Sequence, residues 1–205
     1  MFRVTVSRLR EMAKTMSTQN GVNPSAEGIA AAAKEAKGRG LPPVHLWNPP
    51  FCGDLDMQIK KDGTWIHEGG KINRPEMVKL FSSILRKEGD SYFLVTPVEK
   101  VGITVEDVPF VATDIVVEGE GNAQVIRFET HVGDITKVDD EHPIRVEIDP
   151  GSDEPKPYAM VRSGLEARLD RKTFYRLVDL GTERDGWFGV YSSGAFFPLI
   201  KADRL

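Results

Sequence analysis

The chain has 205 residues, of which 40% are apolar and 28% are charged, and its formal net charge is −4 at pH 7. A chain of this length can bury enough apolar surface to fold as one large or two small domains, without disulfides or a structural metal. It holds no run of about 18 apolar residues, which argues against a transmembrane helix. Its acidic balance argues against general binding to nucleic acid or to an anionic membrane.

The N-terminus and the single cysteine indicate a cytoplasmic protein. Residues 1–15 carry four basic residues against one acid and lack the apolar centre of a secretory signal. Met16 is an alternative start to Met1. Cys52 has no partner for an internal disulfide, which is typical of a reducing compartment.

A helix and a proline-rich segment come first. Residues 25–37 are predicted to form a short surface helix with Ser25 as its N-cap. Because most of its apolar residues are alanines, we expect it to dock loosely. The sequence LPPVHLWNPPF, residues 41–51, has four prolines, which remove amide donors and favour extended backbone. It is predicted to lie over the domain as a strap held by Trp47 and Phe51.

A hairpin, a helix and a strand follow. The sequence GDLDMQIKKDGTWIHEGG, residues 53–70, reads as strand, turn and strand around Asp62-Gly63. Asn73 is predicted to cap the helix, with Glu76 reaching back to it. Apolar residues at helical spacing run from Met77 to Leu85, and Gly89 is predicted to end the helix. The sequence SYFLVTPVEKVGI then returns to strand.

The rest of the chain is rich in strand patterns. Residues 109–138 predict two long strands and a short third, and PIRVEID predicts a fourth. The sequence YAMVRSGLEARL is a second hairpin, Asp170 caps a second helix that Gly181 ends, and residues 187–200 form a third hairpin. Many short strands separated by turns predict a small antiparallel barrel or sandwich.

Two segments share one pattern. INRPEMVKLF, from Ile72, and LDRKTFYRLV, from Leu169, match at a constant offset of 97 positions, and each follows a hairpin. Duplication of a hairpin–helix–strand unit explains the match; the alternative is two unrelated helices that obey the same capping rules. We therefore predict an α+β fold. It comprises a tail with a short helix (1–43), an N-terminal α+β domain (44–105) and a β-rich C-terminal domain (106–205).

Five motifs in fixed order carry a resemblance: GDLDMQI, DGTWIHEGGKINR, LVTPVEKVGI, VEDVPF and PYAMVRSGLEARLDR. With them, residues 44–200 resemble the DUF1285 family, a bacterial family of unknown function. The resemblance implies an α+β fold with a repeated unit and a C-terminal domain similar to pleckstrin-homology-like barrels. It also implies a signalling role with a nucleotide-like ligand at the domain interface, and no established catalytic residues. The chain departs from the family pattern at His131, where we expect Asn.

Three arginines are candidate anion ligands. Arg74 and Arg171 stand just inside the two helix starts, where free amides and the helix dipole favour anions. If the two units face each other, both helix starts line one cleft. Arg162 of the second hairpin is a candidate to face the same cleft, and its alternative is a solvated strand residue. The alternative is that each helix-start arginine pairs with a local carboxylate, such as Glu68 or Glu166.

Two carboxylates and a histidine form a candidate catalytic set. Asp54 and Asp56 fall on the same side of a strand, about 7 Å apart from the strand rise. With His67 they suggest a hydrolase; the simpler interpretation is a backbone cap and a solvated carboxylate. A carboxylate pair without a His ligand beside it falls short of a metal site.

Other candidates have structural alternatives. Trp65 and Trp187 can stack on a base or fill a core. Glu99 and Lys100 can contact a ligand or form an ion pair in a turn. The chain has no P-loop, dinucleotide fingerprint, nucleophile elbow or zinc spacing.

We therefore predict a non-enzymatic, cytoplasmic signalling module that needs no cofactor and no metal. It binds a small anionic ligand, with nucleotides as one candidate, in the cleft between the domains. The residues assigned to this site are Arg74, Arg162, Arg171, Asp54, Asp56, Trp65, His67, Glu99 and Lys100. The alternatives are a protein–protein adaptor and, with less support, the hydrolase.

Overall fold

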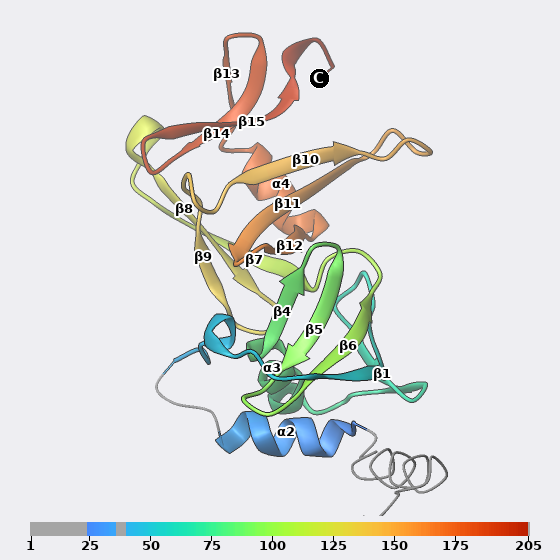
Figure 1. The fold of residues 1–205 in the computed structure, drawn as a ribbon. Coiled ribbons are helices and arrows are strands. Elements are labelled where there is room, and N and C mark those ends of the chain that lie inside the picture. Colours follow the sequence, from blue (N-terminus) through green and yellow to red (C-terminus); the bar gives the residue numbers. More distant parts are fainter. Residues whose placement is uncertain (1–23, 36–39, 205) are drawn as a thin grey trace, which may run out of the picture.

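The structure is a computed structural model that describes residues 24–35 and 40–204, so the choice between Met1 and Met16 lies outside the described residues. The protein has two mostly β domains with few helices, one above the other in Figure 1. The longest helix of the described part has 10 residues, and no helix there is long and apolar enough to cross a membrane.

The N-terminal domain is a six-stranded sheet with the order β3-β2-β1-β6-β5-β4. Its strands are β1 (Phe51–Ile59), β2 (Trp65–His67), β3 (Gly70–Lys71), β4 (Leu85–Glu88), β5 (Ser91–Val95) and β6 (Lys100–Val105). All neighbours pair antiparallel except β1 and β6, which are parallel. The hairpin predicted around Asp62-Gly63 is confirmed.

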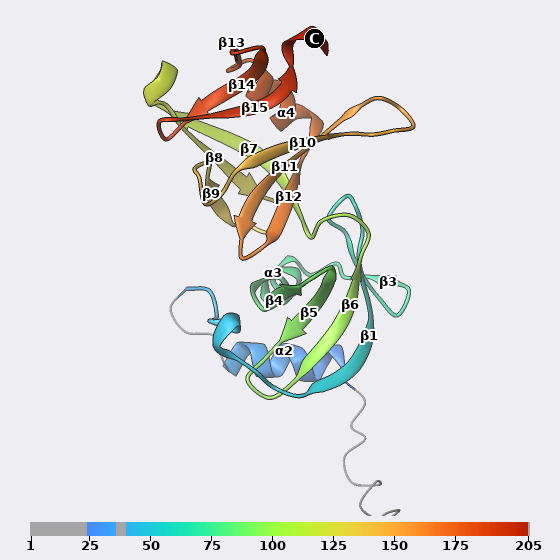
Figure 2. The same ribbon diagram turned by 45° about the horizontal axis from the view of Figure 1, so that its top comes forward.

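Two helices cover this sheet, as Figure 2 shows. In α2 (Ala26–Glu35), one face is buried, and it consists of Ile29 and three alanines, Ala26, Ala30 and Ala33. The expectation of a loosely docked helix is therefore wrong, since alanines allow α2 to approach α3 (Pro75–Ser83) closely. At the centre of the domain, Trp65 stacks on Phe81 of α3 with ring centroids 6.1 Å apart.

The boundaries of α3 differ from the prediction at both ends. Its N-cap is Arg74, in extended backbone, and not Asn73. The reason is Pro75, because a residue that precedes proline is disfavoured in helical backbone. The helix ends at Ser83, and Leu85 instead opens β4, where it pairs with Leu94 of β5. Gly89 does not end the helix but lies in the β4–β5 turn, with φ of +58°.

The predicted strap is held by Trp47, which packs against the core as predicted, and by a guanidinium group that the sequence did not indicate. Residues Val44–Leu46 form a short 3-10 turn rather than extended backbone. Arg86 of β4 donates to the carbonyl oxygens of Val44 at 3.1 Å and of Trp47 at 2.7 Å. Phe51 remains 54% exposed and makes an edge contact with Phe93.

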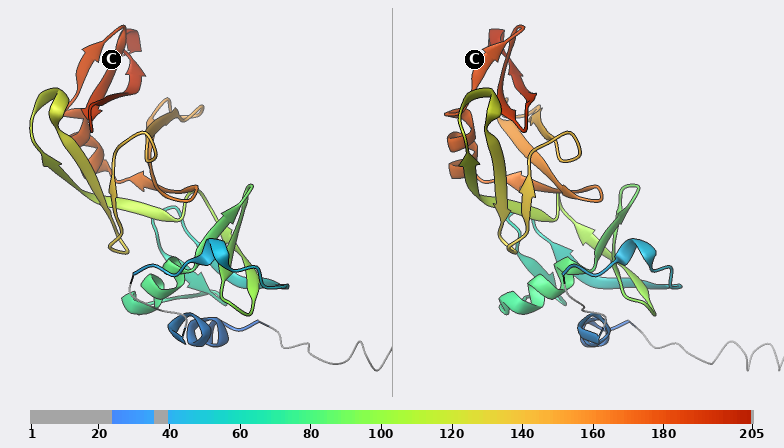
Figure 3. Two further views of the ribbon diagram at one scale, coloured as in Figure 1. Left: turned by 60° about the vertical axis from the view of Figure 1, so that its left-hand side comes forward. Right: turned by 90° about the vertical axis from the view of Figure 1, so that its left-hand side faces the viewer.

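The C-terminal domain contains a second six-stranded sheet, with the order β10-β11-β12-β7-β8-β9. Its strands are β7 (Phe110–Glu118), β8 (Val125–Thr130), β9 (Ile135–Lys137), β10 (Ile144–Ile148), β11 (Pro155–Arg162) and β12 (Leu165–Leu169). The Thr136 hydroxyl of β9 donates to the Met160 carbonyl of β11 at 3.0 Å. The sheet therefore curls, so that its edge strand β9 approaches β11 near the opposite edge (Figure 3). It is a curled half-barrel, and not fully antiparallel as predicted, because β12 and β7 run parallel.

The second helix and the last strands complete this domain. Asp170 caps α4 (Arg171–Val178) as predicted, since its carboxylate accepts from the Thr173 amide at 2.7 Å. The strands β13 (Thr182–Arg184), β14 (Trp187–Ser192) and β15 (Ala195–Lys201) form a separate three-stranded sheet. The strands after α3, by contrast, rejoin the sheet of their own domain.

Candidate functional site

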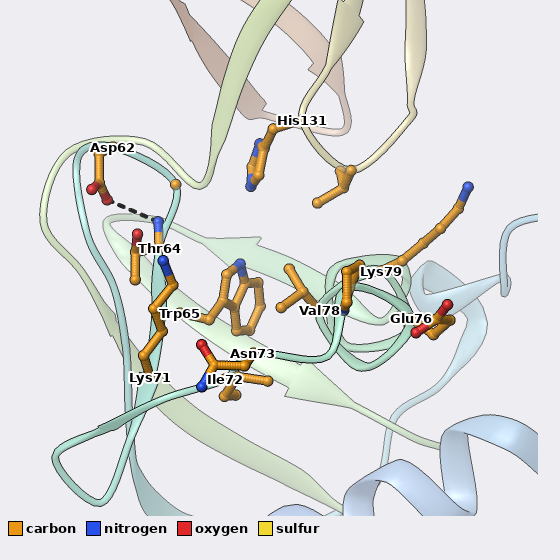
Figure 4. Close-up of a pocket in the computed structure, with 13 residues that line it drawn as sticks. Asp62, Thr64, Trp65, Lys71, Ile72, Asn73, Glu76, Val78, Lys79 and His131 are labelled. Atoms are coloured by element: carbon orange, nitrogen blue, oxygen red, sulfur yellow. Dashed lines mark hydrogen bonds between the residues drawn. The ribbon is translucent and has the colours of Figure 1, made fainter.

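A pocket of about 710 Å³ opens where the β1–β2 turn and α3 face the loop between β8 and β9 (Figure 4). It therefore draws on both domains. Its walls are formed by Asp62, Gly63, Thr64, Trp65, Lys71, Ile72, Asn73, Pro75, Glu76, Val78, Lys79, His131 and Val132. This lining combines polar groups with apolar side chains, which is a common composition for a small-molecule site.

The β1–β2 turn fixes one wall of the pocket. The carboxylate of Asp62 accepts from the Thr64 amide at 2.9 Å, and this bond lowers the pKa of that carboxyl. Gly63 has φ of +82°, a conformation that glycine adopts readily. A Cβ at Gly63 would lie 2.9 Å from Nε2 of His131, so the turn fits closely under the imidazole.

His131 forms the opposite wall. Its amide donates to the Val111 carbonyl at 2.8 Å, and the Val111 amide donates back to Nδ1 at 3.2 Å. One edge of the residue is exposed, yet burial of the ring lowers its pKa. An amide that donates to Nδ1 also favours the neutral ring. His131 is therefore neutral at pH 7.

Trp65 lies between these walls with an unused donor. The side chain is 1% exposed, and within the described part of the chain Nε1 has no hydrogen-bond partner. In Figure 4 this nitrogen is turned toward the side of the pocket where His131 lies. A buried donor without a partner costs about 1–3 kcal/mol, so such groups call for a physical explanation.

Arg162 joins the two domains beside the pocket. Its guanidinium bonds to Asp134, donates to the Ser82 carbonyl of α3 at 2.7 Å, and lies 4.9 Å from the Phe110 ring centroid. Both side chains of the ion pair are less than 20% exposed. Arg162 thus faces the other domain, but protein groups already occupy it.

The two helix-start arginines line no common pocket among the described residues. Arg74 is exposed next to the pocket and is not part of its lining. Arg171 lines a different pocket of about 430 Å³, where Nε donates to the Tyr175 hydroxyl at 2.9 Å. Glu166, considered as a partner for Arg171, instead accepts two bonds from Arg145.

The candidate catalytic set is spread along β1 and β2. Asp54 and Asp56 are both exposed, on the same side of β1 as expected, and Asp54 lines another small pocket. His67 donates from Nδ1 to the Asp56 backbone carbonyl at 2.8 Å, not to its carboxylate. Of the nine assigned residues, only Trp65 lines the interdomain pocket.

Glu99 and Lys100 lie at a turn away from the pocket. The Glu99 amide donates to the Thr96 hydroxyl at 3.2 Å, and Lys100 pairs with Glu88 at 3.0 Å. Trp187, 39% exposed, lines a separate pocket on the C-terminal sheet. Within residues 24–35 and 40–204, no cluster of three or more His, Cys, Asp or Glu residues could hold a metal ion.

Sequence reasoning missed most of the pocket. Lys71 lies in the motif DGTWIHEGGKINR, and Val78 and Lys79 lie in INRPEMVKLF, but neither motif marks these residues as ligands. Val132 lies in no motif, and only topology brings the four residues together. Val78 and Lys79 fall between the buried positions of the α3 stripe, which predicts partial exposure but no ligand role. One sequence feature singled out His131, namely that it stands where the family pattern is expected to have Asn.

A mostly β protein of two domains, with a pocket that draws on both, is the class that this fold and site define. The chain belongs to the DUF1285 family of proteins of unknown function. The N-terminal domain of that family matches residues 42–108, and its C-terminal domain matches residues 109–199. None of the curated proteins matches the chain.

Two solved structures are similar to the chain. A DUF1285 family protein from Silicibacter pomeroyi DSS-3 is 58% identical, with a TM-score of 0.82 over 86% of this chain and 97% of that one. A second, from Shewanella baltica OS155, is 28% identical, with a TM-score of 0.50 over 61% of this chain and 91% of that one. The chain therefore shares its fold with the first of these proteins over most of its length.

Proposed function

We propose that this protein is a non-enzymatic module that binds a small anionic ligand in the interdomain pocket and acts in bacterial signalling. The observation that carries the proposal is the buried indole N–H of Trp65, which has no partner within the described residues on the wall of a 710 Å³ pocket. An acceptor on a ligand would satisfy that donor. Because both domains form the walls, ligand binding would also bias how they sit together, which is how a binding event becomes a signal.

The separation of the candidate catalytic residues supports a binding role over a hydrolytic one. A general base needs to be within hydrogen-bond reach of the group it activates. His67 is held by a backbone carbonyl, and the two aspartates on β1 lie outside the pocket. A cytoplasmic location is part of the same proposal and is supported by the free, exposed Cys52.

We also propose that the two domains, divided near residue 106, descend from a duplicated unit. In support, each has an antiparallel hairpin, β1–β2 or β11–β12, followed by a helix, and each hairpin has one strand in parallel pairing. A relationship of the C-terminal domain to pleckstrin-homology-like barrels is a further proposal. The curl of its sheet and its single helix support it.

Thermal unfolding of the full chain tests the binding function. The probes are nucleotides, small phosphates and small carboxylates. A ligand at 100 times its Kd adds about 2.7 kcal/mol, which raises Tm by roughly 5–10 °C for a chain of this size. We expect at least one probe to do so in the wild type.

A matched pair of variants places the site. Val78→Arg introduces a long side chain into the pocket and is expected to abolish the shift in Tm. Val116→Arg makes the same change on β7, where Val116 is 49% exposed and lines none of the pockets described above, and is expected to retain the shift. No shift with any probe, or a full shift in Val78→Arg, would argue against the proposal and favour a protein partner.

A further inference from the structure

Apolar side chains from both domains line part of the interdomain pocket. Ile72 and Val78 are partly buried, Val132 is 6% exposed, and Trp65 adds the edge of its indole ring. An apolar lining of this kind favours a ligand with a hydrocarbon or aromatic body, because burial contributes about 25 cal/mol per Å² of apolar surface.

The unused donor of Trp65 defines the chemistry at one end of the ligand. An indole N–H only donates, so its partner has to be an acceptor. Carboxylate oxygen is a strong acceptor for a buried N–H, and hydrogen bonds to charged groups are about twice as strong as neutral ones. In Figure 4 the Lys71 side chain ends near Thr64, on the Trp65 side of the pocket, while Lys79 extends away. The Lys79 ammonium lies 3.2 Å from the position of a Cβ at Gly133.

The charged residues that line the pocket supply too little positive charge to bind a polyphosphate. Lys71 and Lys79 are balanced by Asp62 and Glu76, and His131 is neutral at pH 7. A diphosphate or triphosphate brings several negative charges, for which proteins usually supply arginine forks and free amides. No arginine occurs among the described residues that line the pocket.

The start of α3 does not replace these missing groups. Pro75 at its first position has no N–H, and Glu76 already places a carboxylate in the first turn. A negative side chain there interacts favourably with the helix dipole and repels a second anion. The Arg162 guanidinium is bonded to Asp134 and Ser82.

We infer that the ligand is a small monocarboxylate with an apolar body, rather than a nucleotide. Its carboxylate accepts from Trp65 Nε1 and is neutralised by Lys71, while its body lies on Ile72, Val78 and Val132. The inference rests on the proposed function and narrows it to one ligand class. Lys71 is thereby a specificity-determining residue, and Lys79 is not.

The test follows the indole N–H signals of the ¹⁵N-labelled full chain. Three tryptophans give three indole signals, and Trp65→Phe identifies the one to follow. The probes are hexanoate, its neutral amide hexanamide, pyrophosphate and ATP. We expect hexanoate to move the Trp65 signal downfield with saturation, hexanamide to bind at least tenfold more weakly, and both phosphates to leave the signal in place.

Two lysine variants keep the test valid even if Trp65→Phe fails to fold, since both side chains are exposed. Lys71→Gln is expected to weaken hexanoate binding at least fivefold, and Lys79→Gln less than twofold. If the Trp65 signal moves with ATP or pyrophosphate but not with hexanoate, the inference of a monocarboxylate ligand is wrong, while the proposed binding function is retained. If no probe moves the signal and none raises Tm, the binding function falls as well.

Discussion

At the scale of single residues, Gly63 meets two separate constraints. Its φ of +82° lies in the left-handed region, and a Cβ would approach His131 Nε2 to 2.9 Å. Gly69 shares only the first constraint, because its φ is +75° and a Cβ there would meet no atom within 4 Å. A comparison of the two glycines therefore separates the energetic cost of left-handed backbone from that of the contact between Gly63 and His131, which joins the domains.

Alanine substitutions at both glycines test this separation. Gly69→Ala is expected to destabilise by about 1–2 kcal/mol, the usual penalty of left-handed backbone for a residue with a Cβ. Gly63→Ala is expected to lose roughly 1 kcal/mol more, because His131 has to move. Urea unfolding measures both, and the additional loss should shrink when His131 is also changed to Ala. Equal losses at the two glycines would show that the contact is unimportant.

At the scale of elements, α3 and α4 share a sequence pattern but begin differently. In α4, Asp170 accepts from the Thr173 amide at 2.7 Å, and Lys172 imposes no restriction on Arg171. In α3, Pro75 holds Arg74 in extended backbone, with φ of −99°, so Arg74 and not Asn73 becomes the N-cap. Relative to the shared pattern, α3 therefore begins one residue later than α4.

This difference predicts unequal effects of removing the two polar side chains. Asp170→Ala is expected to destabilise by about 1 kcal/mol through loss of a capping bond, while Asp170→Asn retains most of the stability. Asn73→Ala is expected to change stability by less than about 0.5 kcal/mol, as for a surface position. Chemical denaturation of the three variants provides the comparison. A large loss in Asn73→Ala would mean that Asn73 caps the helix after all.

At the scale of the whole molecule, Arg162 couples the two domains. It connects β11 to Asp134 in the β8–β9 loop and to the last turn of α3, and it covers the Phe110 ring. Buried apolar residues of both domains also form one continuous cluster. We expect the protein to unfold in a single transition, with circular dichroism and tryptophan fluorescence giving coincident curves.

Removing this connection should reduce both stability and cooperativity. Arg162→Ala is expected to destabilise by roughly 2–4 kcal/mol, because the carboxylate of Asp134 loses its partner in a partly buried position. The two unfolding curves should then separate. Arg184→Ala, which removes an exposed arginine with contacts only inside its own sheet, should cost less than about 1 kcal/mol and leave the two curves coincident. Coincident curves and little loss of stability in Arg162→Ala would show that the domains do not depend on this residue.

The sequence by itself determined those features that depend on neighbouring residues. The Asp62-Gly63 and Ser163-Gly164 turns, the Asp170 cap and the alternation of Leu55, Met57 and Ile59 with the exposed aspartates follow from local backbone and burial rules. The same local rules also predict the correct start of α3, because Pro75 disfavours helical backbone at Arg74. Leu85 was misassigned because an apolar residue suits a buried helix and a buried strand equally.

Only the tertiary structure decided which side chains meet. Arg74 and Arg171 occupy equivalent places in the pattern, yet they lie at separate surfaces. His131 lies in none of the five motifs, yet it shares a pocket with Trp65 and Lys71 of the motif DGTWIHEGGKINR. Strand pairing set this arrangement, since the order of β1, β6, β7 and β12 in the sheets places the β8–β9 loop over the β1–β2 turn. Contacts between residues more than 60 positions apart depend on chain topology, which no local pattern specifies.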